Sequence, residues 1–242
     1  SKKNIKKESG KSMRIQGLQK LTLIDYPEKA ACTIFTAGCN FRCPFCHNAC
    51  LVTQTEENED LSKDEIMDFL KKRRNILDGV CISGGEPMLQ TDLEEFIKEV
   101  KEMGYLVKID TNGSFPERLE RLTEEKLIDY VAMDIKNSKE HYARTAGLPK
   151  LDLRPIEESV SFLMEGNVPY EFRTTVVREF HQKSDFEQIG LWIRGADKYY
   201  LQQFKDSGNL IRSGLRAYDE SVLSQALEVV KKYVPNAQLR GL

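Results

Sequence analysis

Short apolar runs alternate with amphipathic segments from residue 30 to the end of the chain. Six of these runs are rich in β-branched and aromatic residues and are bounded by turn formers, which is typical of strands: residues 31–35, 80–83, 106–110, 130–135, 171–177 and 199–204. Six strand–helix units with right-handed crossovers predict one parallel sheet wrapped by helices. The 242 residues, 40% of them hydrophobic, suffice for one such domain.

Helix signals lie between these runs. Ser62 and Glu65 form an S-x-x-E capping box ahead of an apolar helical face, and Thr91 and Glu94 repeat that pattern. Gly104 then offers a left-handed end to the second helix. We expect further helices after residues 116, 155 and 185 and over 221–233.

Charge and hydropathy limit the partners of the chain. The 36 basic and 38 acidic residues nearly balance, so no nucleic acid or membrane surface is indicated as a partner. No apolar run approaches the roughly 18 to 20 residues of a membrane span, and the Lys-rich residues 1–12 lack the apolar segment of a signal peptide. We expect a cytoplasmic protein with a disordered extension at 1–12 and one folded domain at 13–242.

The residues that follow each strand are the first place to look for a site, because ligands of such folds bind beyond the carboxyl ends of the strands. The six ends read TAGCNFRC, SGGEP, DTNG, DIKN, VVRE and FKDS. Glycine, aspartate, asparagine, lysine and cysteine gather there. This composition is typical of an active-site rim.

A cysteine cluster directly follows the first strand. Cys39, Cys43 and Cys46 are spaced C-x3-C-x2-C, and Gly38 allows the sharp turn from strand to loop. Thiolates at this spacing can converge on one iron–sulfur cluster, each binding a different iron. A four-iron cluster with three protein ligands keeps one iron open.

Other uses of these cysteines compete with that interpretation. A zinc site would add Cys50 but lacks a second cysteine knuckle downstream. Attachment of a c-type haem at Cys43-Pro-Phe-Cys46-His47, or a redox dithiol, would leave Cys39 unused. A polar wall is the favoured role for His47, and packing is favoured for Cys50. If the chain is not an enzyme, the alternative is a metal-binding or electron-transfer protein without catalysis.

Several motifs together resemble those of a known family. The three-cysteine motif, followed by SGGEP at the end of the next strand, resembles the radical S-adenosylmethionine (SAM) enzymes. CPFCHN, SGGEPMLQ, DTNG and MDIK resemble the glycyl-radical-enzyme activases in order and position. LTLIDYPEKAACTIFTAGCNFRCPFCHN resembles the activating proteins of anaerobic ribonucleoside-triphosphate reductase. The resemblance covers about residues 13–242, thins after residue 140 and implies a partial (β/α)6 barrel, open along one side.

The resemblance implies a chemistry. Cys39, Cys43 and Cys46 would hold a [4Fe-4S] cluster whose fourth iron is chelated by SAM. A flavodoxin or ferredoxin-like reductant would supply one electron, and cleavage of the C5′–S bond would give a 5′-deoxyadenosyl radical. That radical would take hydrogen from a backbone glycine of the partner, anaerobic ribonucleotide reductase. An activase of the pyruvate formate-lyase type and a radical SAM enzyme acting on a small molecule are the alternatives.

The resemblance also implies the positions that contact SAM. These are Phe45, Gly84, Gly85, Glu86, Asp110, Thr111, Asp134, Ile135, Lys136, Thr174 and Gln203. Phe45 would border the adenine, Glu86 would place negative charge near the ammonium group, and Lys136 would pair with the carboxylate. Asp134 would accept hydrogen bonds from the ribose, and Asp110 with Asp134 could hold a monovalent cation.

Two departures from related enzymes matter. Where pyruvate formate-lyase activases carry a histidine on the sixth strand, this chain reads LQQFKDS, so we expect Gln203 or Lys205 to take that place. No cysteine follows Cys81, and the stretch from Cys46 to Gly84 is short. An auxiliary cluster of the kind found in larger activases and sulfatase maturases is therefore not expected.

Overall fold

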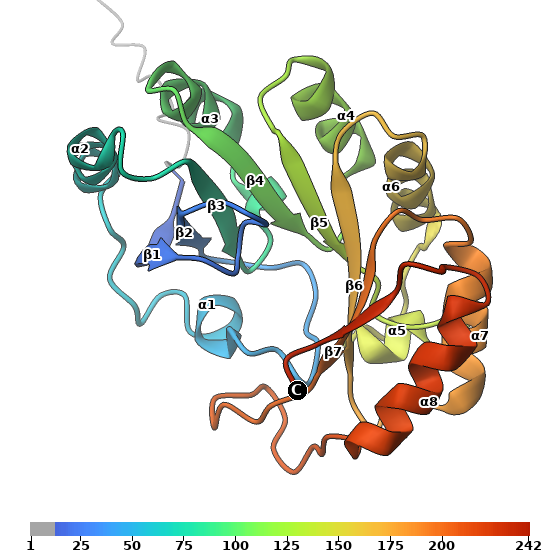
Figure 1. Ribbon diagram of the computed structural model, residues 1–242. Helices are drawn as coiled ribbons and strands as arrows, with labels where there is room; N and C mark the ends of the chain where they lie inside the picture. The colour runs from blue at the N-terminus through green and yellow to red at the C-terminus, as the bar shows by residue number, and fades with distance from the viewer. Residues whose placement is uncertain (1–12) are drawn as a thin grey trace, which may run out of the picture.

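The computed structural model describes residues 13–242 (Figure 1). The extension expected at 1–12 lies outside the described residues. One sheet contains eight strands in chain order: β1 (Ile15–Thr22), β2 (Ala31–Thr36), β3 (Gly79–Gly84), β4 (Leu106–Thr111), β5 (Tyr130–Asp134), β6 (Tyr170–Val176), β7 (Tyr199–Gln203) and β8 (Gln238–Arg240).

Strands β2 to β7 are the six that the sequence predicts, and each pairs in parallel with the next. The helices connect them: α1 (Ala49–Thr53), α2 (Lys63–Arg73), α3 (Leu93–Glu102), α4 (Pro116–Glu124), α5 (Tyr142–Thr145), α6 (Arg154–Met164), α7 (Lys183–Trp192) and α8 (Glu220–Lys231), with a 3₁₀ turn at Pro87–Leu89. Figure 1 shows most of them along the outer side of the curved sheet. The predicted single-domain partial barrel is confirmed.

The two edge strands, β1 and β8, are not among the predicted strands. The residues of β1, IQGLQKLT, mix polar and apolar types without clear alternation, because this strand lies at the edge and pairs antiparallel with β2 alone. The three residues of β8 are too few to give a pattern. No pairing joins β1 to β8 among the described residues, so the sheet stays open between them.

The helix starts follow their sequence signals in part. The capping box of Ser62 and Glu65 is present at α2, and Gly104 has the left-handed φ of +89° expected after α3. The helix start predicted at Thr91 and Glu94 lies one residue too early, because the N-cap residue of α3 is Asp92, whose side chain makes no cap bond. The carboxylate of Glu94 instead accepts hydrogen bonds from two arginines of α4, Arg118 and Arg121.

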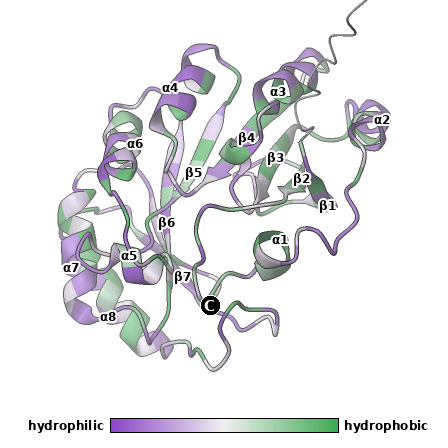
Figure 2. Cartoon of the chain, turned by 180° about the vertical axis from the view of Figure 1, so that it is seen from behind, coloured by the Kyte–Doolittle hydropathy of each residue, from purple (hydrophilic) through white to green (hydrophobic). Residues whose placement is uncertain are grey.

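The core lies between the outer face of the sheet and the helices, as the alternation along β6 illustrates. Phe172 and Thr174 are fully buried, whereas Arg173 and Thr175 remain partly exposed on the inner side of the barrel. Strands β2 and β3 are mostly hydrophobic, whereas β6 and the helices carry both kinds of residue (Figure 2). No helix within residues 13–242 is long and apolar enough to cross a membrane.

Candidate active site

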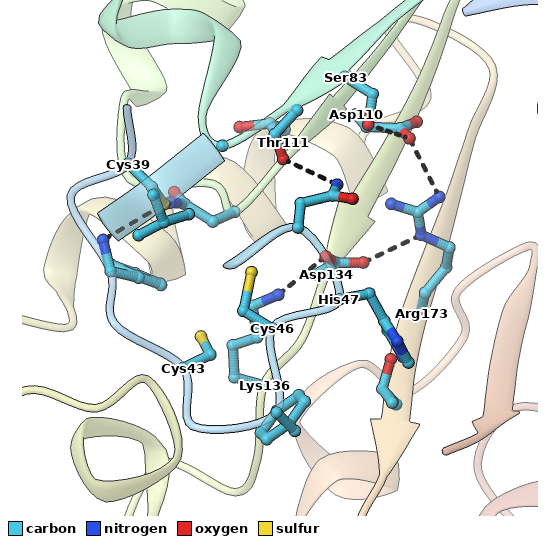
Figure 3. Close-up of a pocket in the computed structure, with 18 of the residues that line it drawn as sticks. Cys39, Cys43, Cys46, His47, Ser83, Asp110, Thr111, Asp134, Lys136 and Arg173 are labelled. Carbon is cyan, nitrogen blue, oxygen red and sulfur yellow. Dashed lines mark hydrogen bonds and ion pairs between the residues drawn. The ribbon is translucent and has the colours of Figure 1, made fainter. Parts of the chain in front are cut away.

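A cavity of about 390 Å³ lies at the carboxyl ends of the parallel strands. One wall is the loop after β2, residues 38–48, which we call the cluster loop; the other walls come from the ends of β3 to β7 (Figure 3). The predicted site residues that line it are Cys39, Cys43, Phe45, Cys46, Gly84, Gly85, Asp110, Thr111, Asp134 and Lys136. The strand ends therefore bring most of the predicted set together.

The three cysteines of the motif face this cavity as free thiols. Cys43 is buried, and Cys39 and Cys46 are half-buried. Burial raises the pKa of the Cys39 thiol to about 12 and that of Cys43 to about 11. These thiols are thus protonated at neutral pH in the metal-free protein, and binding of a metal group would release their protons.

The glycines after β3 fix the position of the cluster loop. Gly85 N donates to Thr36 O at 2.9 Å, and Glu86 N donates to Gly38 O at 2.8 Å. A Cβ atom on Gly85 would lie 1.9 Å from Gly38 O, and one on Gly84 would lie 2.3 Å from the Thr36 backbone. Both positions need glycine because two backbones meet there, even before any cofactor is considered.

The carboxylate of Glu86 is fully buried and does not line the cavity. It accepts hydrogen bonds from Asn112 N at 2.7 Å, Thr111 Oγ1 at 3.0 Å and Met88 N at 3.1 Å. Burial raises its pKa to about 7 in spite of these donors. The residue predicted to place charge beside SAM is instead located beneath the site, where it joins the end of β3 to the end of β4.

An ion-pair network crosses the floor of the cavity. Arg173 Nε lies 2.9 Å from Asp134 Oδ1, and Lys136 Nζ lies 2.8 Å from Asp134 Oδ2 (Figure 3). Burial works against all three charges, but the two cations lower the pKa of Asp134, and Asp134 raises the pKa of Lys136. Lys136 is therefore a fixed cation at the end of β5.

The space between the two carboxylates predicted to hold a cation contains Arg173. Its Nη1 lies 3.5 Å from Asp110 Oδ2, while its Nε reaches Asp134. Asp110 also pairs with Lys108 and accepts a hydrogen bond from Ser83 Oγ at 3.0 Å. These carboxylates thus have cationic partners within the protein and do not form an open oxygen cage.

Three further predicted contacts point elsewhere. Thr174 Oγ1 donates to Ile135 O at 2.7 Å and accepts from the Tyr199 hydroxyl at 2.7 Å on the buried side of β6. Ile135 is fully buried. Gln203 Nε2 donates to Tyr218 O at 2.8 Å, and Gln203 lines a smaller neighbouring cavity together with Lys205.

The cavity receives Thr175 and Gln202 in place of Thr174 and Gln203. A one-residue difference inverts the direction of a strand side chain, so the predictions of Thr174 and Gln203 each miss the cavity-lining residue by one position. Asp25 was missed altogether. It comes from the loop between β1 and β2 and accepts a hydrogen bond from Thr33 Oγ1 at 2.6 Å, and no local motif marks it.

Comparison with known proteins decides the family. The family model described as Radical SAM superfamily matches residues 33–192, which contain the cluster loop and β3 to β6. The chain belongs to the radical SAM superfamily.

Two curated relatives match most of the chain in sequence, and a solved structure shares its fold. MJ1227 of Methanocaldococcus jannaschii, which carries the name of a glycyl-radical enzyme activating enzyme, is 37% identical over 94% of this chain and 96% of its own length. The pyruvate formate-lyase-activating enzyme of Staphylococcus aureus is 28% identical over 68% of this chain and 69% of its own. The crystal structure of Streptococcus suis SuiB bound to its precursor peptide SuiA has a TM-score of 0.68 at 16% identity, covering 86% of this chain and 48% of SuiB.

Radical SAM membership implies an iron–sulfur cluster and SAM, and the residues present suit both. Three thiols of one loop line one cavity, and none of the remaining cysteines does: Cys32 and Cys81 are buried in strands and Cys50 lies on α1. Within residues 13–242, no three histidine, cysteine, aspartate or glutamate side chains lie close enough together to hold a single metal ion. The cysteine ligands of an iron–sulfur cluster each bind a different iron. They therefore need to face the same cavity, and they do not need to converge on one ion.

Proposed function

We propose that this radical SAM enzyme is an activase that generates a glycyl radical on a partner enzyme, anaerobic ribonucleotide reductase. The observation that carries the activase assignment is the 37% identity with MJ1227 across nearly the full length of both chains. The segment LTLIDYPEKAACTIFTAGCNFRCPFCHN, which resembles ribonucleotide reductase activating proteins, supports the choice of partner.

The cysteines would bind the cluster, and residues at the strand ends would bind SAM. Cys39, Cys43 and Cys46 would hold a [4Fe-4S] cluster as thiolates, leaving one iron for SAM. Lys136, a fixed cation at the cavity wall, would pair with the SAM carboxylate. Phe45, which lines the cavity and packs on Phe180, would border the adenine. When bound, the cluster and SAM supply a carbon radical able to abstract hydrogen.

The polar groups on the other strands would orient SAM and the partner's glycine. Thr175 and Gln202, at the ends of β6 and β7, face the cavity from the side of the open barrel edge. The gap between β1 and β8 suits a peptide loop that must enter the site, and a filled cavity excludes water from a reactive radical. Arg173 supplies the cationic charge between Asp110 and Asp134, so no added cation is needed at this floor.

We further propose that residues 13–242 are the catalytic domain of a cytoplasmic protein reduced by a flavodoxin or ferredoxin-like carrier. The six cysteines are all free thiols, which fits a reducing compartment.

The test is anaerobic reconstitution with iron and sulfide, followed by SAM, dithionite and a candidate anaerobic ribonucleotide reductase. Formation of 5′-deoxyadenosine together with the doublet of a glycyl radical in the paramagnetic resonance spectrum is the expected result. The Cys43→Ala variant is the control and should give neither signal. SAM cleavage without a glycyl radical would overturn the reductase assignment, and a radical on pyruvate formate-lyase instead would replace the partner.

A further inference from the structure

Five exposed arginines lie around the outer side of the cluster loop. They are Arg42, Arg144, Arg178, Arg212 and Arg216, and none of them lines the cavity. We call this surface the arginine face. It combines residues from the cluster loop, from α5, from the turn after β6 and from the loop between β7 and α8.

Backbone contacts attach the arginine face to the cluster loop. Arg42 N donates to Ala146 O at 2.9 Å, and Arg212 N donates to Pro44 O at 2.9 Å. Pro44 lies between two of the cluster cysteines, Cys43 and Cys46. In Figure 1 the loop between β7 and α8, in orange, runs beside the light-blue cluster loop. The face is therefore the outer layer of the loop whose inner side forms the cavity.

The remaining arginines are joined to one another through the turn after β6. Arg178 N donates to Arg216 O at 3.0 Å, and Arg144 Nη2 donates to Glu179 O at 3.1 Å. Glu179 Oε1 and Oε2 accept hydrogen bonds of 2.9 Å from Arg216 Nε and N. These contacts join the segments that carry the five arginines.

Positive charge on this face is largely uncompensated. Among residues 13–242, Glu179 is the one carboxylate paired with these arginines, and it pairs with Arg216. The side chains of Arg178 and Arg212 form no ion pair or hydrogen bond with the described residues. Since the whole chain has a formal charge of −2, the face is a local feature and not a consequence of a basic composition.

Two aromatic rings, Phe180 and Phe45, lie between the Arg144 guanidinium and the cavity. The rings of Phe45 and Phe180 are 5.8 Å apart, and the Arg144 guanidinium carbon lies 5.5 Å from the centre of the Phe180 ring. Phe45 is 4% exposed and Phe180 is 5% exposed, so both rings are buried. An electron donor bound on the arginine face would stand next to the loop that carries the cluster cysteines.

We propose that the arginine face is the docking surface for an acidic one-electron carrier protein of the ferredoxin or flavodoxin class. The reduced carrier loses one electron and the cluster held by Cys39, Cys43 and Cys46 gains it, with no bond formed or broken. Complementary charge would speed encounter and orient the carrier over the cluster loop. The proposal deepens the proposed function, but it rests on the cluster alone and not on the identity of the glycyl partner.

The face suits a carrier better than it suits the enzyme that is activated. A glycine that is to lose hydrogen must enter the cavity, and the five arginines lie outside it. An electron donor has the opposite requirement, because it must approach the cluster loop without blocking the cavity.

The experiment compares the double variant Arg178→Glu/Arg212→Glu with Arg74→Glu. Arg74, an exposed residue that follows α2, takes part in none of the contacts described above and is the matched control. Binding of an acidic flavodoxin to the cluster-loaded protein is measured by calorimetry at low and at physiological ionic strength. SAM cleavage is measured in parallel with reduced flavodoxin and with dithionite.

We expect the double variant to bind flavodoxin at least about tenfold more weakly at low salt, and the wild-type affinity to fall as salt rises. Flavodoxin-driven cleavage should fall with it, while dithionite-driven cleavage and the Arg74→Glu control stay at the wild-type level. Unchanged flavodoxin binding in the double variant would overturn the proposal. So would a variant that keeps flavodoxin-driven cleavage but loses the glycyl radical, or wild-type protein that binds a DNA duplex and not flavodoxin. Failure to activate any glycyl-radical enzyme would leave the flavodoxin result intact.

Discussion

Arg173 Nε lies 2.9 Å from Asp134 Oδ1 and ties the inner faces of β5 and β6 together beneath the cavity. The same guanidinium reaches Asp110 on β4 at 3.5 Å. Three neighbouring strands are thus joined by one half-buried cation. We expect Arg173 to stabilise the fold at this site and to take the place of a bound cation between the two carboxylates.

Replacing Arg173 by glutamine should destabilise the fold. The change leaves Asp134 and Asp110 each with one cationic partner fewer in a largely buried site, which costs about 3 kcal/mol in free energy of unfolding. Urea unfolding of the metal-free protein measures it. Arg154→Gln is the control, because its pair with Asp152 is fully exposed and should contribute little to stability. Equal losses in the two variants would contradict the role given to Arg173.

The same residue leads to a prediction about cations. Because Arg173 lies between the carboxylates, the wild-type affinity for SAM should be the same in potassium, sodium or tetramethylammonium chloride. Arg173→Gln should make SAM binding depend on a small cation, as measured by calorimetry on the cluster-loaded protein. A wild-type enzyme that requires potassium or sodium would show that Arg173 moves aside and that the cation expected from the sequence binds.

The three motif cysteines should each be required for cluster binding, and Cys50 should not. Cys43→Ala is expected to hold little iron after anaerobic reconstitution, because two thiolates cannot replace the three that line the cavity. Cys50→Ala should keep the wild-type iron content, since Cys50 lies on α1 outside the cavity lining. Iron and sulfide content and visible absorption measure both. Loss of iron in Cys50→Ala would instead support a metal site with four cysteine ligands.

The strand ends were predictable from the sequence, and the side-chain directions were not. Runs such as VCIS and YVAMDI indicate strands because β-branched and apolar residues are confined to them, and the carboxyl ends of parallel strands must share one edge. Which of Thr174 and Thr175, or of Gln202 and Gln203, faces the cavity depends on a register that pairing with neighbouring strands sets. Glu86 was misplaced because its turn folds inward to meet Thr111, a contact between residues distant in sequence.

Changing the two threonines of β6 to valine should affect different properties, stability in one case and SAM binding in the other. Thr174→Val leaves the buried Tyr199 hydroxyl and Ile135 carbonyl without their 2.7 Å partners, which should cost about 1–3 kcal/mol in stability. Thr175→Val should change stability by less than about 0.5 kcal/mol but weaken SAM binding by roughly fivefold to tenfold, because this side chain lines the cavity. Urea unfolding and calorimetry separate the two. Weaker SAM binding from Thr174→Val alone would reverse the assignment.

Glu86 should make stability fall as pH rises. Burial raises its pKa from 4.5 to about 7, so between these values the folded state holds a proton that the unfolded state has lost. The wild-type protein should therefore be more stable than Glu86→Gln at pH 5, and this margin should shrink by about 2–3 kcal/mol at pH 8. Urea midpoints at the two pH values test it. A margin that grows with pH would mean that the three donors keep the carboxylate ionised.

Gly85→Ala should damage cluster binding without touching a cysteine. The added Cβ atom would lie 1.9 Å from Gly38 O and 3.3 Å from Cys39 Cβ, so the start of the cluster loop must shift. Overpacking of this kind costs about 1–3 kcal/mol in stability, and the displaced thiol should lower the iron bound after reconstitution. Gly166→Ala is the control, because its Cβ meets nothing within 4 Å and only the left-handed backbone at φ +78° is strained. Gly166→Ala should lose about 1 kcal/mol in free energy of unfolding and keep its iron. Full iron content in Gly85→Ala would show that the cluster loop adjusts, and the SGGEP turn would then matter for SAM alone.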